Sequence, residues 1–134
     1  MIIVDSSAWI EFYRPSGSPG VRAVVAAAVD SDLVAVNGVI QVEVLAFSSH
    51  RDNRRKLVSD FEALHWLDLG KSSFDLATEI GFRARSEGIT VPATDLIIAA
   101  SAVESDSVLL HADTHFDLLV PHSGLKSRNL LVQY

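Results

Sequence analysis

The chain has 134 residues, of which 49% are hydrophobic and none is cysteine, and its formal net charge is −6. That length predicts a single domain over residues 1–134; the missing cysteine excludes disulfides and thiolate metal sites; and the charge argues against a simple nucleic-acid coat protein, which would be basic. The start of the chain lacks a basic leader and no apolar stretch approaches the roughly 20 residues of a membrane span, so we expect a cytoplasmic protein without a membrane contact.

Short apolar runs alternate with longer segments of helical spacing along the whole chain. In chain order we expect a strand at 2–4, helices at 6–13 and 19–29, a strand at 33–36, helices at 38–47 and 52–64, a strand at 66–69, helices at 72–87 and 92–104, a strand at 108–110 and a fifth strand at 129–132. This alternation predicts an α/β fold with a mostly parallel sheet of four to five strands covered by helices on both faces. In such folds the functional site lies beyond the carboxyl ends of the strands, where the strand order reverses.

Four acidic residues stand where chemistry is expected, although each has an ordinary explanation by itself. Asp5 follows the first strand and could simply cap a helix. Glu43 interrupts an almost wholly apolar stretch, where a solvent-facing position is an equal alternative. Asp95 suits the first turn of a helix, and Asp113, just past the fourth strand, suits a turn. The predicted topology nevertheless brings all four to one cleft, where a divalent cation would relieve their mutual repulsion.

The segments around these acids resemble the motifs of PIN-domain nucleases, in the same order and over essentially the whole chain. The first motif is similar to residues 4–10, the second to 41–45 and the fourth to 109–116. The third motif, at residues 89–100, is a close match and the most specific of the four.

The resemblance implies a PIN-like three-layer α/β/α sandwich of the kind found in VapC, the toxin of VapBC toxin–antitoxin pairs. It further implies an endoribonuclease that depends on Mg²⁺ or Mn²⁺, forms a homodimer and is inhibited by a cognate VapB-type antitoxin. By the same resemblance, Asp5, Glu43, Asp95 and Asp113 are the catalytic residues and metal ligands. Ser7 occupies the position of a serine or threonine near the metal. His111 departs from the pattern, because the family commonly has threonine or serine there, but a neutral imidazole can still hydrogen-bond a carboxylate.

Two other functions stay open. A PIN-like module could bind RNA or a partner protein without cutting, and a DNA-directed nuclease is a further alternative that the small size argues against.

Several residues near the motifs also have more than one interpretation. His111 and His115 flank Asp113, and we interpret them as polar loop residues beside a hard-metal site rather than as a transition-metal site. Asp117 is a candidate for a peripheral, water-mediated ligand. The remaining candidates for contacts with RNA or a partner are the basic segment 50–56, Arg83 and Arg85, and the aromatic residues Trp9, Phe12 and Tyr13.

Overall fold

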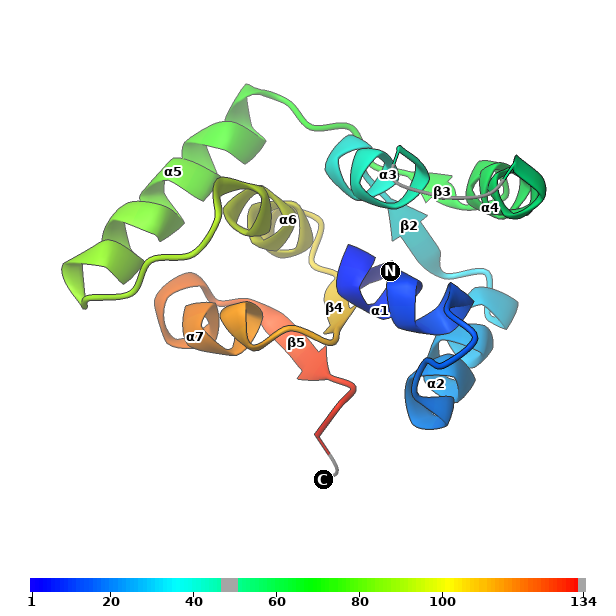
Figure 1. Cartoon of the computed structure of the whole chain (residues 1–134). Coiled ribbons are helices and arrows are strands. Elements are labelled where there is room, and N and C mark those ends of the chain that lie inside the picture. The colour runs from blue at the N-terminus through cyan, green and yellow to red at the C-terminus, as the bar shows by residue number, and fades with distance from the viewer. Residues whose placement is uncertain (47–50, 133–134) are drawn as a thin grey trace.

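The structure is a computed structural model that describes residues 1–46 and 51–132 (Figure 1). Strands and helices alternate along it, as the sequence predicts. The elements are β1 Ile2–Val4, α1 Ser6–Tyr13, α2 Pro19–Asp30, β2 Val34–Val36, α3 Gly38–Leu45, α4 Arg51–Glu62, β3 His65–Trp66, α5 Lys71–Ser86, α6 Ala93–Glu104, β4 Val108–His111, α7 Thr114–Ser123 and β5 Lys126–Asn129.

The five strands form one parallel sheet in the order β3-β2-β1-β4-β5. From β1 the chain adds β2 and β3 on one side and then returns to add β4 and β5 on the other. The order therefore reverses between β1 and β4, which pair along their length from Ile2 opposite Val108 to Val4 opposite Leu110. Loops leaving the carboxyl ends of β1 and β4 diverge there and leave room for a site. The predicted α/β fold is confirmed, with all strands parallel.

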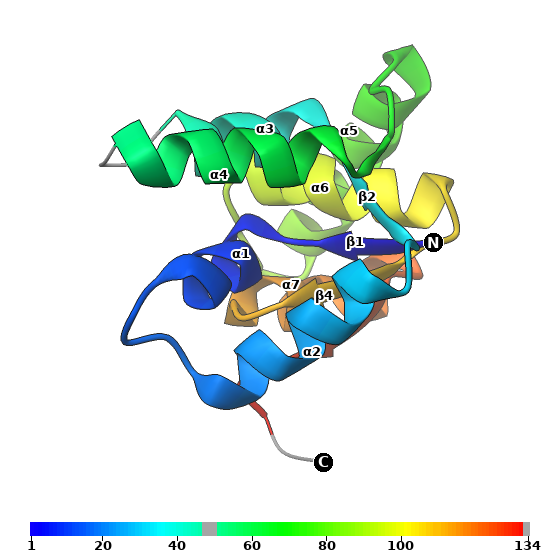
Figure 2. The same ribbon diagram turned by 90° about the vertical axis from the view of Figure 1, so that its right-hand side faces the viewer.

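Helices cover both faces of this sheet. Both views place α2 and α6 on opposite sides of the central strands, and α7 lies on the α6 side (Figures 1 and 2). Trp9 of α1, only 1% exposed, packs against Phe61 of α4 with ring centroids 5.0 Å apart, so α1 and α4 share a layer. The strands between the layers supply a continuous apolar core, in which Ile3, Val4 and Leu109 are buried. Within residues 1–46 and 51–132, no helix is both long and apolar enough to cross a bilayer.

The C-terminal region differs most from the sequence prediction. The fifth strand was predicted three residues too late: it lies at Lys126–Asn129 and not at 129–132. Leu131, which follows it, is 56% exposed. Helix α7 was not predicted, although Asp113 caps it and Phe116 and Leu119 form its buried face. Strand β3 ends at Trp66 instead of residue 69, because it is a short edge strand. Helix α3 is described to Leu45, and its predicted end at residue 47 lies outside the described residues.

Candidate active site

Asp5 is placed by the end of β1 and the start of α1. Its extended backbone makes it the N-cap of α1, and its Oδ2 accepts hydrogen bonds from the backbone N–H of Ser7 at 3.0 Å and from Ser7 Oγ at 2.6 Å. Ser7 Oγ in turn accepts from the backbone N–H of Ala112 at 2.9 Å, which ties the end of β4 to Asp5. The side chain of Asp5 is buried, and its Oδ1 has no hydrogen-bond partner. The capping explanation is therefore correct but accounts for only one of the two oxygens.

Glu43 reaches the same place from α3, the helix that follows β2. Asn37, at the end of β2, caps α3 by accepting from the N–H of Ile40 at 3.0 Å, which fixes where the helix starts. Ser6 Oγ donates to Glu43 Oε1 at 3.0 Å. Ser6 and Ser7 are adjacent, so one turn of α1 contacts the carboxylates of both Glu43 and Asp5. The contact of Ser6 was not predicted, because 37 residues separate it from Glu43.

Asp95 and Asp113 complete the group from α6 and from the start of α7. Asp95 lies in the first turn of α6 and is 8% exposed. Asp113 caps α7 by accepting from the N–H of His115 at 2.9 Å. The His115 ring joins the two acids, because its Nδ1 lies 2.9 Å from Asp95 Oδ2 and 3.4 Å from Asp113 Oδ1. One atom each from Asp95, Asp113 and His115 lie within 4.8 Å of one another.

The charges of Asp5, Glu43 and Asp95 act on one another, and Asp113 acts on Asp95. Burial raises the pKa of Asp5 above its ordinary value, although hydrogen bonds from Ser7 oppose the shift. Burial also raises the pKa of Glu43, and the charges of Asp5 and Asp95 add to that rise. The pKa of Asp95 is raised by burial and by the charges of Asp5 and Asp113, against the hydrogen bond from His115.

These shifts run against the local secondary structure. Helix N-termini stabilise negative charge, yet burial outweighs this effect and raises the pKa of Asp5, and burial together with the charges of Asp5 and Asp113 raises that of Asp95. In the part of the chain that the structure describes, no lysine or arginine forms an ion pair with any of the four acids. The unpartnered Oδ1 of Asp5 and this uncompensated charge fit a hard divalent cation, which takes carboxylate oxygens as ligands.

His111 is a fully buried histidine behind the Asp113 turn. Its Nδ1 accepts the backbone N–H of Asp113 at 3.2 Å, so the ring proton sits on Nε2, 3.7 Å from Asp117 Oδ1. Burial lowers the pKa of His111, which keeps the ring neutral and Nδ1 free to accept. Asn129 Nδ2 donates to the other oxygen of Asp117 at 2.9 Å. The imidazole therefore lies directly behind Asp113, its Nε2 without a hydrogen-bond partner among the described residues, while Asp117 connects α7 to β5.

We predict that His111→Ala lowers the free energy of unfolding by about 1–3 kcal/mol, the usual cost of a buried cavity with an unpaired N–H group. Urea denaturation of the purified variant measures it. His111→Asn, which retains a side-chain acceptor, should lose less, and His122→Ala, at a partly exposed position, should lose little. Equal stability of His111→Ala and the parent chain would show that this contact does not support the turn.

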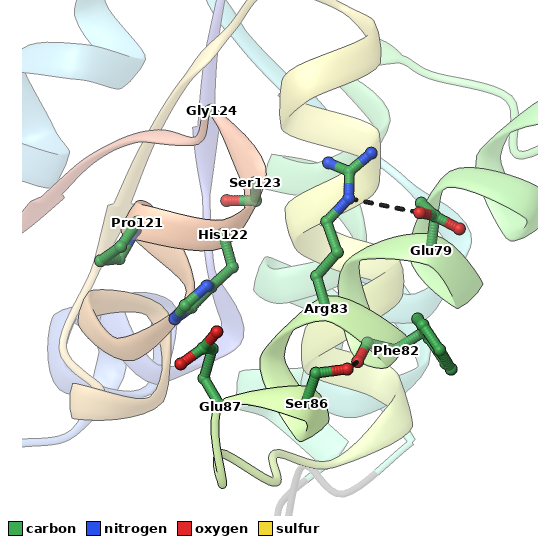
Figure 3. Close-up of a pocket in the computed structure, with 9 residues that line it drawn as sticks. All are labelled: Glu79, Phe82, Arg83, Ser86, Glu87, Pro121, His122, Ser123 and Gly124. Atoms are coloured by element: carbon green, nitrogen blue, oxygen red, sulfur yellow. Dashed lines mark hydrogen bonds and ion pairs between the residues drawn. The ribbon is translucent and has the colours of Figure 1, made fainter.

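Arg83 lies at a separate hollow that none of the four acids lines. A hollow of about 550 Å³ between α5 and α7 is lined by Glu79, Arg83 and His122, among others (Figure 3). Arg83 Nε donates to Glu79 Oε1 at 3.3 Å, so Arg83 forms an ion pair within its own helix, α5. In the basic segment 50–56, His50 lies outside the described residues, whereas residues 54–56 are exposed on α4.

The aromatic residues of α1 form part of the core and part of a second hollow. Trp9 is buried and stacks on Tyr13 with ring centroids 5.9 Å apart. Tyr13 donates to Asp60 of α4 at 2.7 Å. A hollow of about 430 Å³ between α1, α2 and α4 is lined by these rings together with Phe12 and Leu64.

Comparison with known proteins gives matches over nearly all of the chain. Residues 2–119 match the family model described as PIN domain. The chain is 28% identical over 132 residues to VapC ribonuclease Mb1587 of Mycobacterium bovis, which covers 95% of this chain and 97% of the relative.

Solved structures with low sequence identity share the fold. FitAcB from Neisseria gonorrhoeae superimposes with a TM-score of 0.81 at 19% identity, covering 99% of this chain and 100% of that one. VapBC-5 of Mycobacterium tuberculosis, a member of the VapBC family of toxin–antitoxin systems, gives a TM-score of 0.63 at 17% identity, with 93% and 94% covered.

Proposed function

Because this chain belongs to the PIN domain family, by its match over residues 2–119, we propose that it is a metal-dependent endoribonuclease that cleaves RNA phosphodiester bonds. In this proposal residues 1–134 act as a single nuclease domain. The observation that carries the proposal is the proximity of the predicted acids: the charge of Asp5 raises the pKa of both Glu43 and Asp95, and the charge of Asp113 adds to the rise at Asp95. The VapC ribonuclease that is 28% identical over the chain supports RNA as the substrate.

We assign Asp5, Glu43, Asp95 and Asp113 as the ligands of Mg²⁺ or Mn²⁺. When bound, such an ion activates water and neutralises charge on a phosphodiester. The chain's own part is to hold the carboxylates in place: Ser7 fixes Asp5, and Ser6 fixes Glu43. Neutral His111 supports the backbone of Asp113.

We further propose that the chain is the toxin of a type II toxin–antitoxin pair, acting in the cytoplasm as a homodimer and inhibited by a cognate VapB-type antitoxin. The VapC relative spans almost the same length, and the structural neighbours include members of VapBC systems. The aromatic hollow between α1, α2 and α4 offers apolar surface on which an antitoxin segment could pack.

A cleavage assay with the purified chain tests the enzymatic proposal. Labelled RNA is incubated with Mg²⁺ or Mn²⁺, with EDTA, and with EDTA followed by excess metal, beside single-stranded DNA of the same sequence. We expect RNA products only with free metal, restored on re-addition, and little cleavage of DNA. RNA binding that is insensitive to metal and leaves no products would support the non-cleaving module instead. Equal cleavage of DNA would contradict RNA as the substrate class.

A further inference from the structure

His115 is the only nitrogen-bearing side chain in the metal-compatible group that the described residues form. It is the second residue of α7, and its side chain is 41% exposed, so the ring borders solvent while facing the acids. The backbone N–H of the same residue donates to Asp113 Oδ1, which fixes the start of the helix and therefore the ring. From the sequence, His115 was interpreted as a polar loop residue beside a hard-metal site rather than as part of a transition-metal site.

The distances around the His115 ring match those between neighbouring ligands of one ion. Ligand atoms at adjacent corners of an octahedron around a small dication lie about 3 Å apart. Nδ1 of His115 is 2.9 Å from Asp95 Oδ2 and 3.4 Å from Asp113 Oδ1. A second, independent feature points to a cation here: the buried, unpartnered Oδ1 of Asp5, whose charge acts on Asp95.

We propose that His115 Nδ1 is a ligand of the same ion that Asp95 and Asp113 hold, and that this nitrogen makes the site prefer Mn²⁺ over Mg²⁺. The inference rests on the proposed function, which supplies the ion. Mg²⁺ strongly favours oxygen ligands, whereas imidazole nitrogen suits transition-metal dications. With Nδ1 as the ligand, the neutral ring carries its proton on Nε2. The opposing interpretation is that His115 only orients Asp95 through a hydrogen bond and never contacts the ion.

Pulsed electron paramagnetic resonance of the Mn²⁺-loaded protein tests this ligand directly. Nitrogen hyperfine coupling should appear in the parent chain and disappear in His115→Gln, which still binds Mn²⁺ through its carboxylates. Titration calorimetry should show that the preference for Mn²⁺ over Mg²⁺ falls by about 10-fold or more in the variant. Loss of a residue that supports a metal ligand typically lowers metal affinity by about this factor. His122→Gln and His65→Gln, both away from the acids, should keep the coupling.

The outcomes separate this inference from the nuclease proposal. Mn²⁺ that binds the parent chain without nitrogen coupling overturns the role of His115 and leaves the ribonuclease proposal standing. Nitrogen coupling that survives in His115→Gln also overturns it. A parent chain that binds Mg²⁺ but not Mn²⁺ overturns the role of His115 alone, and one that binds neither ion overturns both. If His115→Gln fails to fold by circular dichroism, His115→Asn takes its place with the same expected results.

Discussion

Asp5→Asn and Asp95→Asn should each reduce RNA cleavage by more than about 100-fold, beyond the 10–100-fold cost of losing a residue that merely supports a metal ligand. Asparagine keeps the size of the side chain and can still cap α1, so the fold should be preserved. What it removes is a charged oxygen at a site where the acids face one another without a lysine or arginine partner in the described part of the chain. Initial rates on a labelled RNA, at saturating Mn²⁺ or Mg²⁺, measure the loss.

A matched control is available on the outer surface of α5. Asp75 pairs with Lys71 on an exposed face, and Asp75→Asn should therefore cleave at the parental rate. Circular dichroism and thermal melting should show all three variants folded. Parental activity in both active-site variants would show that Asp5 and Asp95 are not part of the catalytic centre.

In the absence of metal, Asp5→Asn should be more stable than the parent chain at pH 7.5, and the gap should narrow as the pH falls. Burial raises the pKa of Asp5, so the folded chain binds that proton more tightly than the unfolded chain does. The ionised carboxylate therefore destabilises the fold above its folded-state pKa, and this penalty fades as the pH falls toward the ordinary aspartate value of about 4. Urea denaturation in EDTA, at several pH values between 4.5 and 7.5, measures the gap.

Bound metal should make the parent chain more stable than Asp5→Asn. At about 100 times its dissociation constant, Mn²⁺ should raise the free energy of unfolding of the parent chain by about 2.7 kcal/mol and that of Asp5→Asn by much less. Comparing the two proteins at each pH removes the contribution of titrating groups that do not interact with Asp5. Glu43 and Asp95, whose pKa values the charge of Asp5 raises, widen the gap in the same direction. A parent chain that is more stable than Asp5→Asn at pH 7.5 in EDTA would mean that Asp5 is stabilised by its hydrogen bonds and not strained by its charge.

The elements that carry most of the site could be predicted because apolar patterning and topology determine them. Residues 2–4 and 108–110 form uninterrupted apolar runs, which is typical of buried parallel strands. The carboxyl ends of such strands meet at one edge, so Asp5 and Asp113 were expected to lie close together. The helical spacing predicted over residues 38–47 and 92–104 puts Glu43 and Asp95 on helices, and the structure places them on α3 and α6.

The C-terminal region could not be predicted in the same way because its strand is polar. Strand β5 has the sequence Lys-Ser-Arg-Asn and lies at the edge of the sheet, where pairing with β4 and not burial holds it. The strand was predicted at 129–132 instead, because the residues that follow β5 include the apolar Leu130, Leu131 and Val132. Because α7 was not predicted, the contact of His115 with Asp95 was not predicted either, since that contact depends on the helix starting at Thr114. A capping aspartate followed by apolar residues at 116 and 119 was the available signal.

Crystals grown with Mn²⁺ and measured at its absorption edge test the central claim most directly. The account predicts an anomalous peak bound by carboxylate oxygens of Asp5, Glu43, Asp95 and Asp113, at ligand distances of about 2.2 Å for a small dication. Anomalous density elsewhere on the chain, with these carboxylates bound to no common ion, would contradict it.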